Sequence, residues 1–340
     1  MAGRQAQPAG PRPRPCRRPL SDRRADGVRA VRRLRSRHAA RGAQPRLSGM
    51  PPLRGRSRSR VKAIDFHVHL STVEWMVDSL GPLREATERH FRTEVPIRTV
   101  DEMAEEFRAD DVLGVLLAWD AESAMGLPPL TNDFVADCVH RHPDAFVGFA
   151  SVDPWKGKAA RDELRRAVTD LGLCGLKLHP SCQGFAPNER RFYDLYAVAV
   201  ELGIPVIFHT GTTGLGAGVP GGGGIKLGYS RPILLDDVAA DFPELQIVGA
   251  HPSWPWQDEM LAVAQHKTNV WIDLSGWSPR RWAPALTQAV LGPLQDRALF
   301  GTDYPFIRFA KWLDAFRSHE PSSEVEEKVL RENARRLLHI

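Results

Sequence analysis

From residue 61 onward, short runs of apolar residues alternate with longer amphipathic segments. The short runs have the length and the Val, Ile, Leu and Phe content of buried parallel strands, and the longer segments have the period of helices that pack on a sheet. We predict strands at 61–69, 112–119, 146–153, 173–179, 204–210, 245–251, 270–275 and 298–303. We predict helices at 99–111, 130–141, 156–171, 189–202, 233–241, 256–267, 281–291, 306–318 and 323–338.

Eight strands, each followed by a helix, are the elements of a (β/α)8 TIM barrel. We predict that residues 61–340 form this barrel as one catalytic domain. A doubly wound α/β sheet has the same alternation, and periodicity does not determine whether the sheet closes. Thr131 and Asn188 are typical helix starts, and Gly203 is a typical helix stop. The glycine-rich segment 211–224 follows the fifth strand, and its length at a strand end predicts a lid over an active site.

The first 60 residues differ in composition from the rest. They contain 18 Arg, no Lys and two Asp, a net charge of +16, so residues 61–340 carry −11 of the total of +5. Because this region has no aromatic residue and is rich in Pro, Gly and Ala, it cannot bury enough apolar surface to offset its ordering entropy. We predict that residues 1–60 form a disordered extension. A functionless extension is favoured over a transit-like presequence or a polyanion-binding segment, and the lack of stacking aromatics argues against nucleic acid as a partner.

The composition also excludes several classes of protein. No stretch of 18 apolar residues occurs, so no membrane span is predicted, and the N-terminal region has no apolar segment typical of secretion. Cys16, Cys138, Cys174 and Cys182 show no paired spacing for a disulfide or a metal. Reduced thiols of this kind are typical of a cytoplasmic protein, which is the expected localisation.

The first predicted strand ends in the sequence Asp-Phe-His-Val-His. Its two histidines, His67 and His69, are two residues apart, and alternation along a strand sends both side chains to the same face. Neutral imidazole nitrogens are common ligands of zinc and similar ions. The pair therefore suggests part of a metal site, although a His-x-His on an exposed strand has no such role.

Further polar residues lie at the C-terminal ends of other predicted strands. They are Lys177 and His179 on the fourth strand, His209 on the fifth, His251 on the sixth and Asp303 on the eighth. Barrel active sites are built at this face. Any one of these residues alone can be a buried structural histidine or a helix-capping aspartate, but their coincidence at one face predicts a metal centre.

These motifs resemble the amidohydrolase superfamily, and more narrowly its amidohydrolase-related branch, which includes aminocarboxymuconate-semialdehyde decarboxylase and the resorcylate-type decarboxylases. The resemblance covers residues 61–340 and rests on the ordered motifs DFHVH, GLKLHP, PVIFHTG, VGAHPSWPW, LFGTDYPF and ENARRLL. It implies that one divalent metal is bound by His67, His69, His209 and Asp303. Zinc is expected first, with manganese or iron as substitutes. It also implies that His251 is the acid/base group and that Asp303 accepts a proton from metal-bound water.

Lys177 and His179 share one face of the fourth strand. In some members of the superfamily a lysine on this strand is carbamylated and bridges two metals, whereas a single metal is usual in the decarboxylase-like branch. We favour Lys177 as an anchor for a substrate carboxylate over a bridging carbamate or a structural ion pair. His179 either contacts the substrate or only shapes the exit of the strand.

Four tryptophans fall at or just beyond predicted strand ends: Trp119, Trp254, Trp256 and Trp277. Aromatic side chains there suit a planar, conjugated substrate, and rim packing is the alternative. We take Trp254 and Trp256 as candidate substrate-binding residues.

The resulting hypothesis is a single-metal enzyme that acts on a small carboxylated organic acid by non-oxidative decarboxylation. Hydrolysis of an ester, lactone or amide by metal-bound hydroxide needs the same ligands and is the alternative. An alternative of another class is a non-catalytic protein that binds metal, or polyanions through its Arg-rich region. A homodimer is expected from the resemblance alone.

Overall fold

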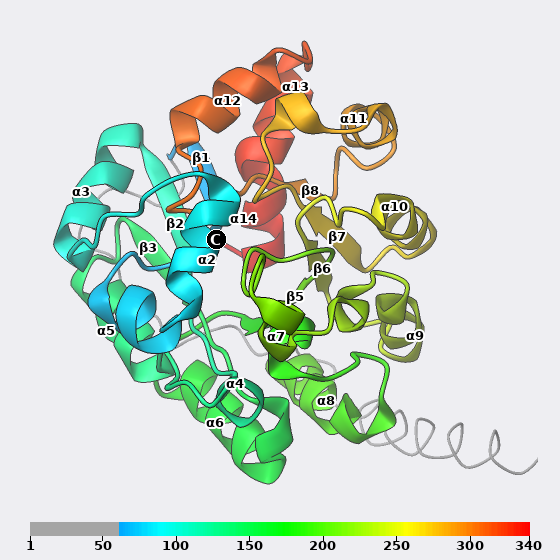
Figure 1. Cartoon of the computed structure of the whole chain (residues 1–340). Helices are drawn as coiled ribbons and strands as arrows, with labels where there is room; N and C mark the ends of the chain where they lie inside the picture. Colours follow the sequence, from blue (N-terminus) through cyan, green and yellow to red (C-terminus); the bar gives the residue numbers. More distant parts are fainter. Residues whose placement is uncertain (1–60) are drawn as a thin grey trace, which may run out of the picture. The chain divides into compact units, whose positions relative to one another are not determined.

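The computed structural model describes residues 61–340, so the predicted N-terminal extension lies outside the described residues. Eight parallel strands lie at the centre and helices surround them (Figure 1). The strands are β1 (Ala63–Val68), β2 (Val112–Leu117), β3 (Phe146–Phe149), β4 (Leu176–Leu178), β5 (Val206–His209), β6 (Ile247–Ala250), β7 (Val270–Asp273) and β8 (Ala298–Leu299). Each lies within a segment that the sequence predicts as a strand.

The strands close into a barrel. Regular parallel ladders join β1 to β3 in one group and β4 to β8 in another. Ala150, which follows β3, forms a parallel bridge with Leu176 of β4. At the other junction Val68 bridges Tyr304, and the amide of His69 donates to the carbonyl of Tyr304 at 2.9 Å. The TIM barrel is therefore confirmed, and the open doubly wound sheet is excluded.

Helices follow the strands on the outside of the barrel. They are α3 (Val100–Asp110), α5 (Asn132–Arg141), α6 (Lys158–Thr169), α8 (Tyr193–Leu202), α9 (Leu234–Asp241), α10 (Gln257–His266), α11 (Pro284–Leu291), α12 (Phe309–Arg317), α13 (Ser323–Glu327) and α14 (Asn333–Leu338). Each falls within a predicted helix. Three more were not predicted: α2 (Leu83–Phe91), α4 (Glu122–Met125) and α7 (Pro180–Gln183).

The two predicted helix starts have different outcomes. Thr131 caps α5, because its hydroxyl accepts the amide of Phe134 at 3.2 Å. Asn188 does not cap a helix; its side-chain amide donates to Asp237 at 2.9 Å, and α8 begins only at Tyr193. Gly203 ends α8 in the left-handed conformation (φ 67°) that favours glycine, as predicted.

Two layers of apolar side chains stabilise the barrel. Alternate residues of each strand point inward or outward, so Leu113 and Val115 of β2 belong to the interior layer, whereas Leu116 packs beneath the surrounding helices. Leu337 of α14 joins the interior layer beside Val61, the residue two positions before β1. The C-terminal helix therefore covers the N-terminal end of the barrel and leaves the opposite end for a site.

Within residues 61–340, no helix combines the length and apolar character needed to cross a membrane. Cys138, Cys174 and Cys182 are buried, and no two of these three residues form a disulfide with each other.

Close packing around β4 leads to a stability prediction. A Cβ atom at Gly175 would lie 2.3 Å from ring atoms of Phe149, whereas a Cβ atom at Gly228 would have no neighbour within 4 Å. We expect Gly175→Ala to lower the free energy of unfolding by about 1–3 kcal/mol through overpacking. Gly228→Ala should be neutral or slightly stabilising. Urea denaturation of the two variants measures the difference, and equal stabilities would contradict the expected packing strain.

Candidate metal centre and active-site cavity

Three side chains meet at the C-terminal end of the barrel. His67 and His69 come from the end of β1 and the residue after it, and Asp303 lies in the loop after β8. The carboxylate Oδ1 of Asp303 is 3.5 Å from Nε2 of His67 and 3.4 Å from Nε2 of His69. One potential ligand atom of each residue lies within 4.8 Å of the other two. Two imidazole nitrogens and a carboxylate form a donor set that fits a divalent transition metal.

A buried carboxylate brings the two halves of this cluster together. Asp65 accepts hydrogen bonds from the amide of Thr302 at 2.9 Å, from its hydroxyl at 2.5 Å and from the amide of His67 at 3.2 Å. Burial raises the pKa of Asp65 to about 7, although the hydrogen bonds from Thr302 and His67 oppose that shift. The contact holds the residue before Asp303 against the strand that carries the histidines.

The strand β1 is irregular at this point. Asp65 pairs with Gly114 and Val68 pairs with Leu116, so β1 has one more residue than β2 between these pairs. Such a bulge changes the direction of neighbouring side chains. The predicted convergence of His67 and His69 is confirmed, but simple alternation along a regular strand does not account for it.

His67 is oriented by a second carboxylate. Its Nδ1–H donates to Asp273 Oδ2, at the end of β7, over 2.6 Å, so its Nε2 faces Asp303. Burial, together with the nearby positive charge of Lys177, lowers the pKa of His67 well below its usual value. The imidazole is therefore neutral at physiological pH, which is the state that a metal ligand requires.

Asp303 is ionised despite its burial. Burial opposes ionisation, but the hydrogen bond to His69 and the surrounding basic groups hold the pKa of Asp303 below its usual value. Its backbone has φ 60°, in the left-handed region that non-glycine residues rarely adopt. Gly276 allows a close approach, since a Cβ atom there would lie 3.2 Å from Asp303 Oδ2 and 2.7 Å from His251 Nδ1.

His209 lies apart from the three clustered groups. Its Nε2–H donates to the carbonyl of Thr212 at 3.1 Å, and its Nδ1 is 3.1 Å from Nε2 of His251. Both ring nitrogens therefore have partners other than a metal. The structure brings together three of the four predicted ligands, and the ligand role of His209 stays a prediction.

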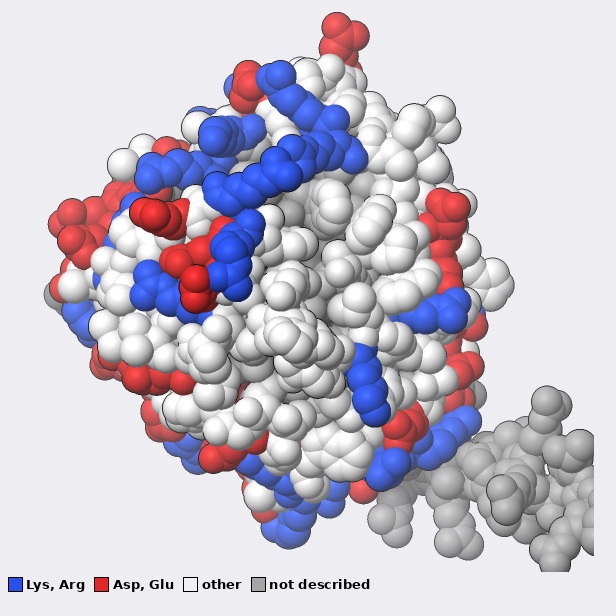
Figure 2. All heavy atoms as spheres, in the orientation of Figure 1, with Lys and Arg blue, Asp and Glu red and all other residues white. Residues whose placement is uncertain are grey.

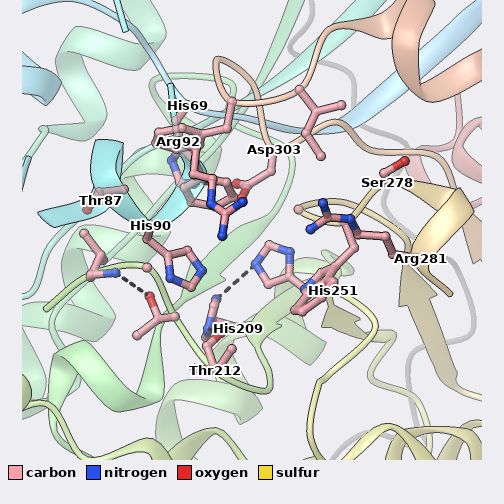
Figure 3. Close-up of a pocket in the computed structure, with 18 of the residues that line it drawn as sticks. His69, Thr87, His90, Arg92, His209, Thr212, His251, Ser278, Arg281 and Asp303 are labelled. Carbon is pink, nitrogen blue, oxygen red and sulfur yellow. Dashed lines mark hydrogen bonds and ion pairs between the residues drawn. The ribbon is translucent and has the colours of Figure 1, made fainter. Parts of the chain in front are cut away.

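His251 belongs to a continuous chain of polar contacts. Its Nδ1 is 2.9 Å from the hydroxyl of Ser275, and this hydroxyl donates to Asp273 at 2.9 Å. Asp273 in turn accepts a hydrogen bond from His67. Figure 3 shows the contact between His209 and His251 at the other end of this chain. Burial lowers the pKa of His251 to about 4, so the ring is neutral at pH 7. A neutral imidazole that contacts a polar chain can pass protons, which is compatible with its predicted acid/base role.

Lys177 and His179 both face this site, as the sequence predicts. The ammonium of Lys177 is 3.0 Å from Nε2 of His67, and burial lowers the pKa of Lys177 below its usual value. His179 stacks on His209 with ring centroids 3.7 Å apart, and its Nδ1 accepts the amide of Cys182 at the start of α7. Lys177 therefore lies beside a metal-ligand nitrogen, and its role as a carboxylate anchor stays a prediction.

A cavity of about 840 Å³ opens above these residues. Its aromatic walls come from Trp75, Phe91, Trp119, Trp277 and Phe306. The ring of Trp75 stacks on His69 at 5.0 Å between centroids. Residues 212–215 of the glycine-rich segment also line the cavity, in the position that the lid interpretation requires.

Trp254 and Trp256 do not line this cavity. The side chain of Trp254 is 56% exposed, and its ring lies 6.1 Å from that of Trp277. Trp256 instead lies beneath the guanidinium of Arg231, 5.9 Å from the ring centroid. These two predicted substrate contacts are corrected: Trp254 is mostly exposed to solvent, and Arg231 lies over the ring of Trp256.

Sequence reasoning missed other residues of the site. Asp273 and Ser275 end the seventh predicted strand in the sequence Ile-Asp-Leu-Ser, and a polar pair at a strand end was the signal available. Trp75 and Arg92 lie in segment 70–99, where no helix was predicted. The helix α2 has few apolar positions and buries only Ala86 and Thr87, so its periodicity is weak.

Known proteins resemble this chain over the whole barrel. The family model described as amidohydrolase matches residues 64–340. Gamma-resorcylate decarboxylase of Rhizobium sp. (strain MTP-10005) is 24% identical over 263 residues, which is 65% of this chain and 78% of the relative. An uncharacterised TIM-barrel protein from Bordetella bronchiseptica has a TM-score of 0.68 and 27% identity, covering 82% of this chain and 98% of its own.

A second similar structure was solved with ligands. It is the 5-carboxyvanillate decarboxylase from Novosphingobium aromaticivorans, complexed with manganese and 4-hydroxy-3-methoxy-5-nitrobenzoic acid. It has a TM-score of 0.62 and 20% identity, covering 83% of this chain and 97% of its own, a likeness that shows the fold. Because the family model matches the described barrel almost from end to end, the chain belongs to the amidohydrolase family of enzymes.

Proposed function

We propose that this chain is a divalent-metal-dependent decarboxylase that releases carbon dioxide from a small aromatic carboxylic acid. The observation that carries the proposal is the cluster of His67, His69 and Asp303 beneath a cavity with aromatic walls. Two of the similar proteins named above are decarboxylases, which supports this reaction over hydrolysis.

The proposed metal would be held by His67, His69 and Asp303, with His209 as a further ligand if its ring turns away from Thr212. When bound, it would supply a positive charge that polarises substrate oxygens. Zinc stays the expected metal from the donor set, and manganese is the alternative that a similar structure contains. Both metals suit imidazole and carboxylate donors, so a reconstitution experiment must compare them.

Protein side chains orient a ligand residue, contact the substrate ring and supply a proton. Asp273 orients His67, and Trp75 and Trp119 provide flat apolar surfaces for a planar ring. Loss of carbon dioxide breaks the bond between the ring and the carboxylate and leaves an electron pair on the ring carbon. One proton must then reach that carbon, and His251, which lines the cavity, is the proposed donor. Ser275 and Asp273 connect His251 to further polar groups through which the proton can be replaced.

The reaction can be tested by following its products. With metal supplied, we expect carbon dioxide release from members of a panel of hydroxylated benzoates such as 2,6-dihydroxybenzoate, with no solvent oxygen-18 in the aromatic product. Oxygen-18 in a new carboxylate, from an ester or lactone panel, would identify hydrolysis instead and reject the proposed reaction. A variant that lacks residues 1–60 should keep the activity, because every residue assigned to the site lies within 61–340.

Removal of one clustered ligand should reduce metal content. We expect His69→Ala to weaken metal binding by about tenfold or more, since a three-residue donor set would lose an imidazole. His90→Ala is the matched control, because His90 also lines the cavity but is not part of the three-residue cluster. Elemental analysis after dialysis measures both proteins, and equal metal loss would contradict the assigned ligands.

His251 can be separated from the ligands by a second variant. We expect His251→Ala to keep the metal and to lower kcat by about 10²- to 10⁴-fold, the usual contribution of a general acid. His266→Ala, at the exposed end of α10, should leave kcat unchanged. Loss of metal together with turnover would show instead that His251 supports the metal centre.

A further inference from the structure

Three basic side chains at the opening of the cavity have no acidic partner among residues 61–340. Arg92, Arg281 and Lys311 all line the cavity, and each is exposed to solvent. None forms an ion pair or a side-chain hydrogen bond with any residue in 61–340 that the structure describes. We call Arg92, Arg281 and Lys311 the basic rim. In Figure 2, Lys and Arg side chains gather along one side of the hollow on this face.

The basic rim is assembled from three separate elements. Arg92 follows α2, Arg281 lies in the short helical turn Pro279–Arg281 before α11, and Lys311 lies on α12. Figure 3 shows the guanidinium groups of Arg92 and Arg281 directed into the cavity, on the side of His69 and His251. Three cations from distant parts of the chain therefore line one cavity, and together they favour the binding of an anion there.

The backbone holds Arg92 in place. Arg92 adopts the left-handed conformation (φ 53°), and its amide donates to the carbonyl of Arg89 at 3.2 Å at the end of α2. This conformation is usual at the end of a helix, so the end of α2 sets the backbone position of Arg92. The amide of Arg281 is likewise bound, to the carbonyl of Ser278 at 2.8 Å. Both guanidinium groups therefore project from ordered turns.

A fourth cation provides an internal comparison. Arg280 also lines the cavity, but its guanidinium pairs with Asp314 at 2.6 Å. Asp314 and the clustered ligand Asp303 are the acidic residues among those that line the cavity. Asp314 thus balances the charge of Arg280, whereas no residue in 61–340 balances the charges of the basic rim.

We infer that the substrate carries a second anionic group, which the basic rim binds while the first carboxylate lies at the metal centre. This inference rests on the proposed function and narrows its substrate class to dianionic aromatic acids. Guanidinium groups bind carboxylates through paired, charge-assisted hydrogen bonds, so Arg92 and Arg281 determine the specificity. A cavity of about 840 Å³ is large for a small-molecule pocket and has room for a ring with a substituent at each end.

Two probes of almost equal shape test the inference by binding alone. Isophthalate has two carboxylates, and 3-carbamoylbenzoate replaces one of them with a neutral amide. We expect calorimetry on the manganese-loaded full chain to show about tenfold tighter binding of isophthalate, because a charged hydrogen bond is worth more than a neutral one. Added salt should reduce this preference, since the rim is exposed.

Variants locate the preference on the rim. Arg92→Gln and Arg281→Gln should each reduce the preference for isophthalate to about twofold or less and leave the affinity for 3-carbamoylbenzoate nearly unchanged. Arg280→Gln, the matched control, should keep the full preference because Asp314 already balances that charge. Thermal unfolding of all three variants checks that the fold is intact.

The outcomes separate the two proposals. Equal affinity of the wild-type protein for the two probes, no binding of isophthalate at millimolar concentration, or an equal loss in Arg280→Gln would overturn the role of the basic rim. Carbon dioxide release is scored independently of these affinities, on the hydroxybenzoate panel extended with hydroxylated isophthalates, which carry the second carboxylate. A retained rim preference without any carbon dioxide release would reject the decarboxylase function and leave an anion-binding cavity of another enzyme in this family.

Discussion

The contact between Asp65 and Thr302 is the interaction on which the metal centre depends. A single buried carboxylate accepts hydrogen bonds from the loop after β8 and from the backbone of β1. Thr302 directly precedes Asp303, and Asp65 lies two residues before His67. The ligands therefore occupy the same space because this carboxylate joins the first and last strands where the barrel closes. Besides this contact, the two strands are joined here by the bridge between Val68 and Tyr304 and by backbone hydrogen bonds from Phe66 to Phe300 and from His69 to Tyr304.

The charged groups at the floor of the cavity differ from those at its opening. At the floor, burial keeps His67 neutral, while nearby basic groups keep Asp303 ionised. These are the states in which both groups can bind a cation. At the opening, exposed cations remain without acidic partners among the described residues, so two positively charged ends would face a bound molecule once a metal is present. This arrangement supports an anionic ligand more directly than it supports a neutral ester or amide.

Sequence periodicity was sufficient for most of the barrel because parallel strands are apolar on both faces and the helices between them are amphipathic. It did not predict α2 in segment 70–99, because that helix buries few residues. The position of Trp254 and Trp256 after a strand end suggested that they contact the substrate, but neither lines the cavity. It also overlooked Asp273, whose importance comes from a 2.6 Å contact with a residue 206 positions away. Such a partner cannot be identified from local pattern, because its role depends on which strands are neighbours.

The sequence by itself determined the order of strands and helices, the residues at each strand end and the family motifs that relate them. Those features follow from local hydrophobic patterning and from residue identity, which a single chain displays directly. Only the tertiary structure decided that the sheet closes and that His67, His69 and Asp303 cluster while His209 turns to Thr212. It also brought to the opening three basic side chains that have no acidic partner among residues 61–340. Each of these features depends on hydrogen bonds and charges between residues that are far apart in the chain and become neighbours only after folding.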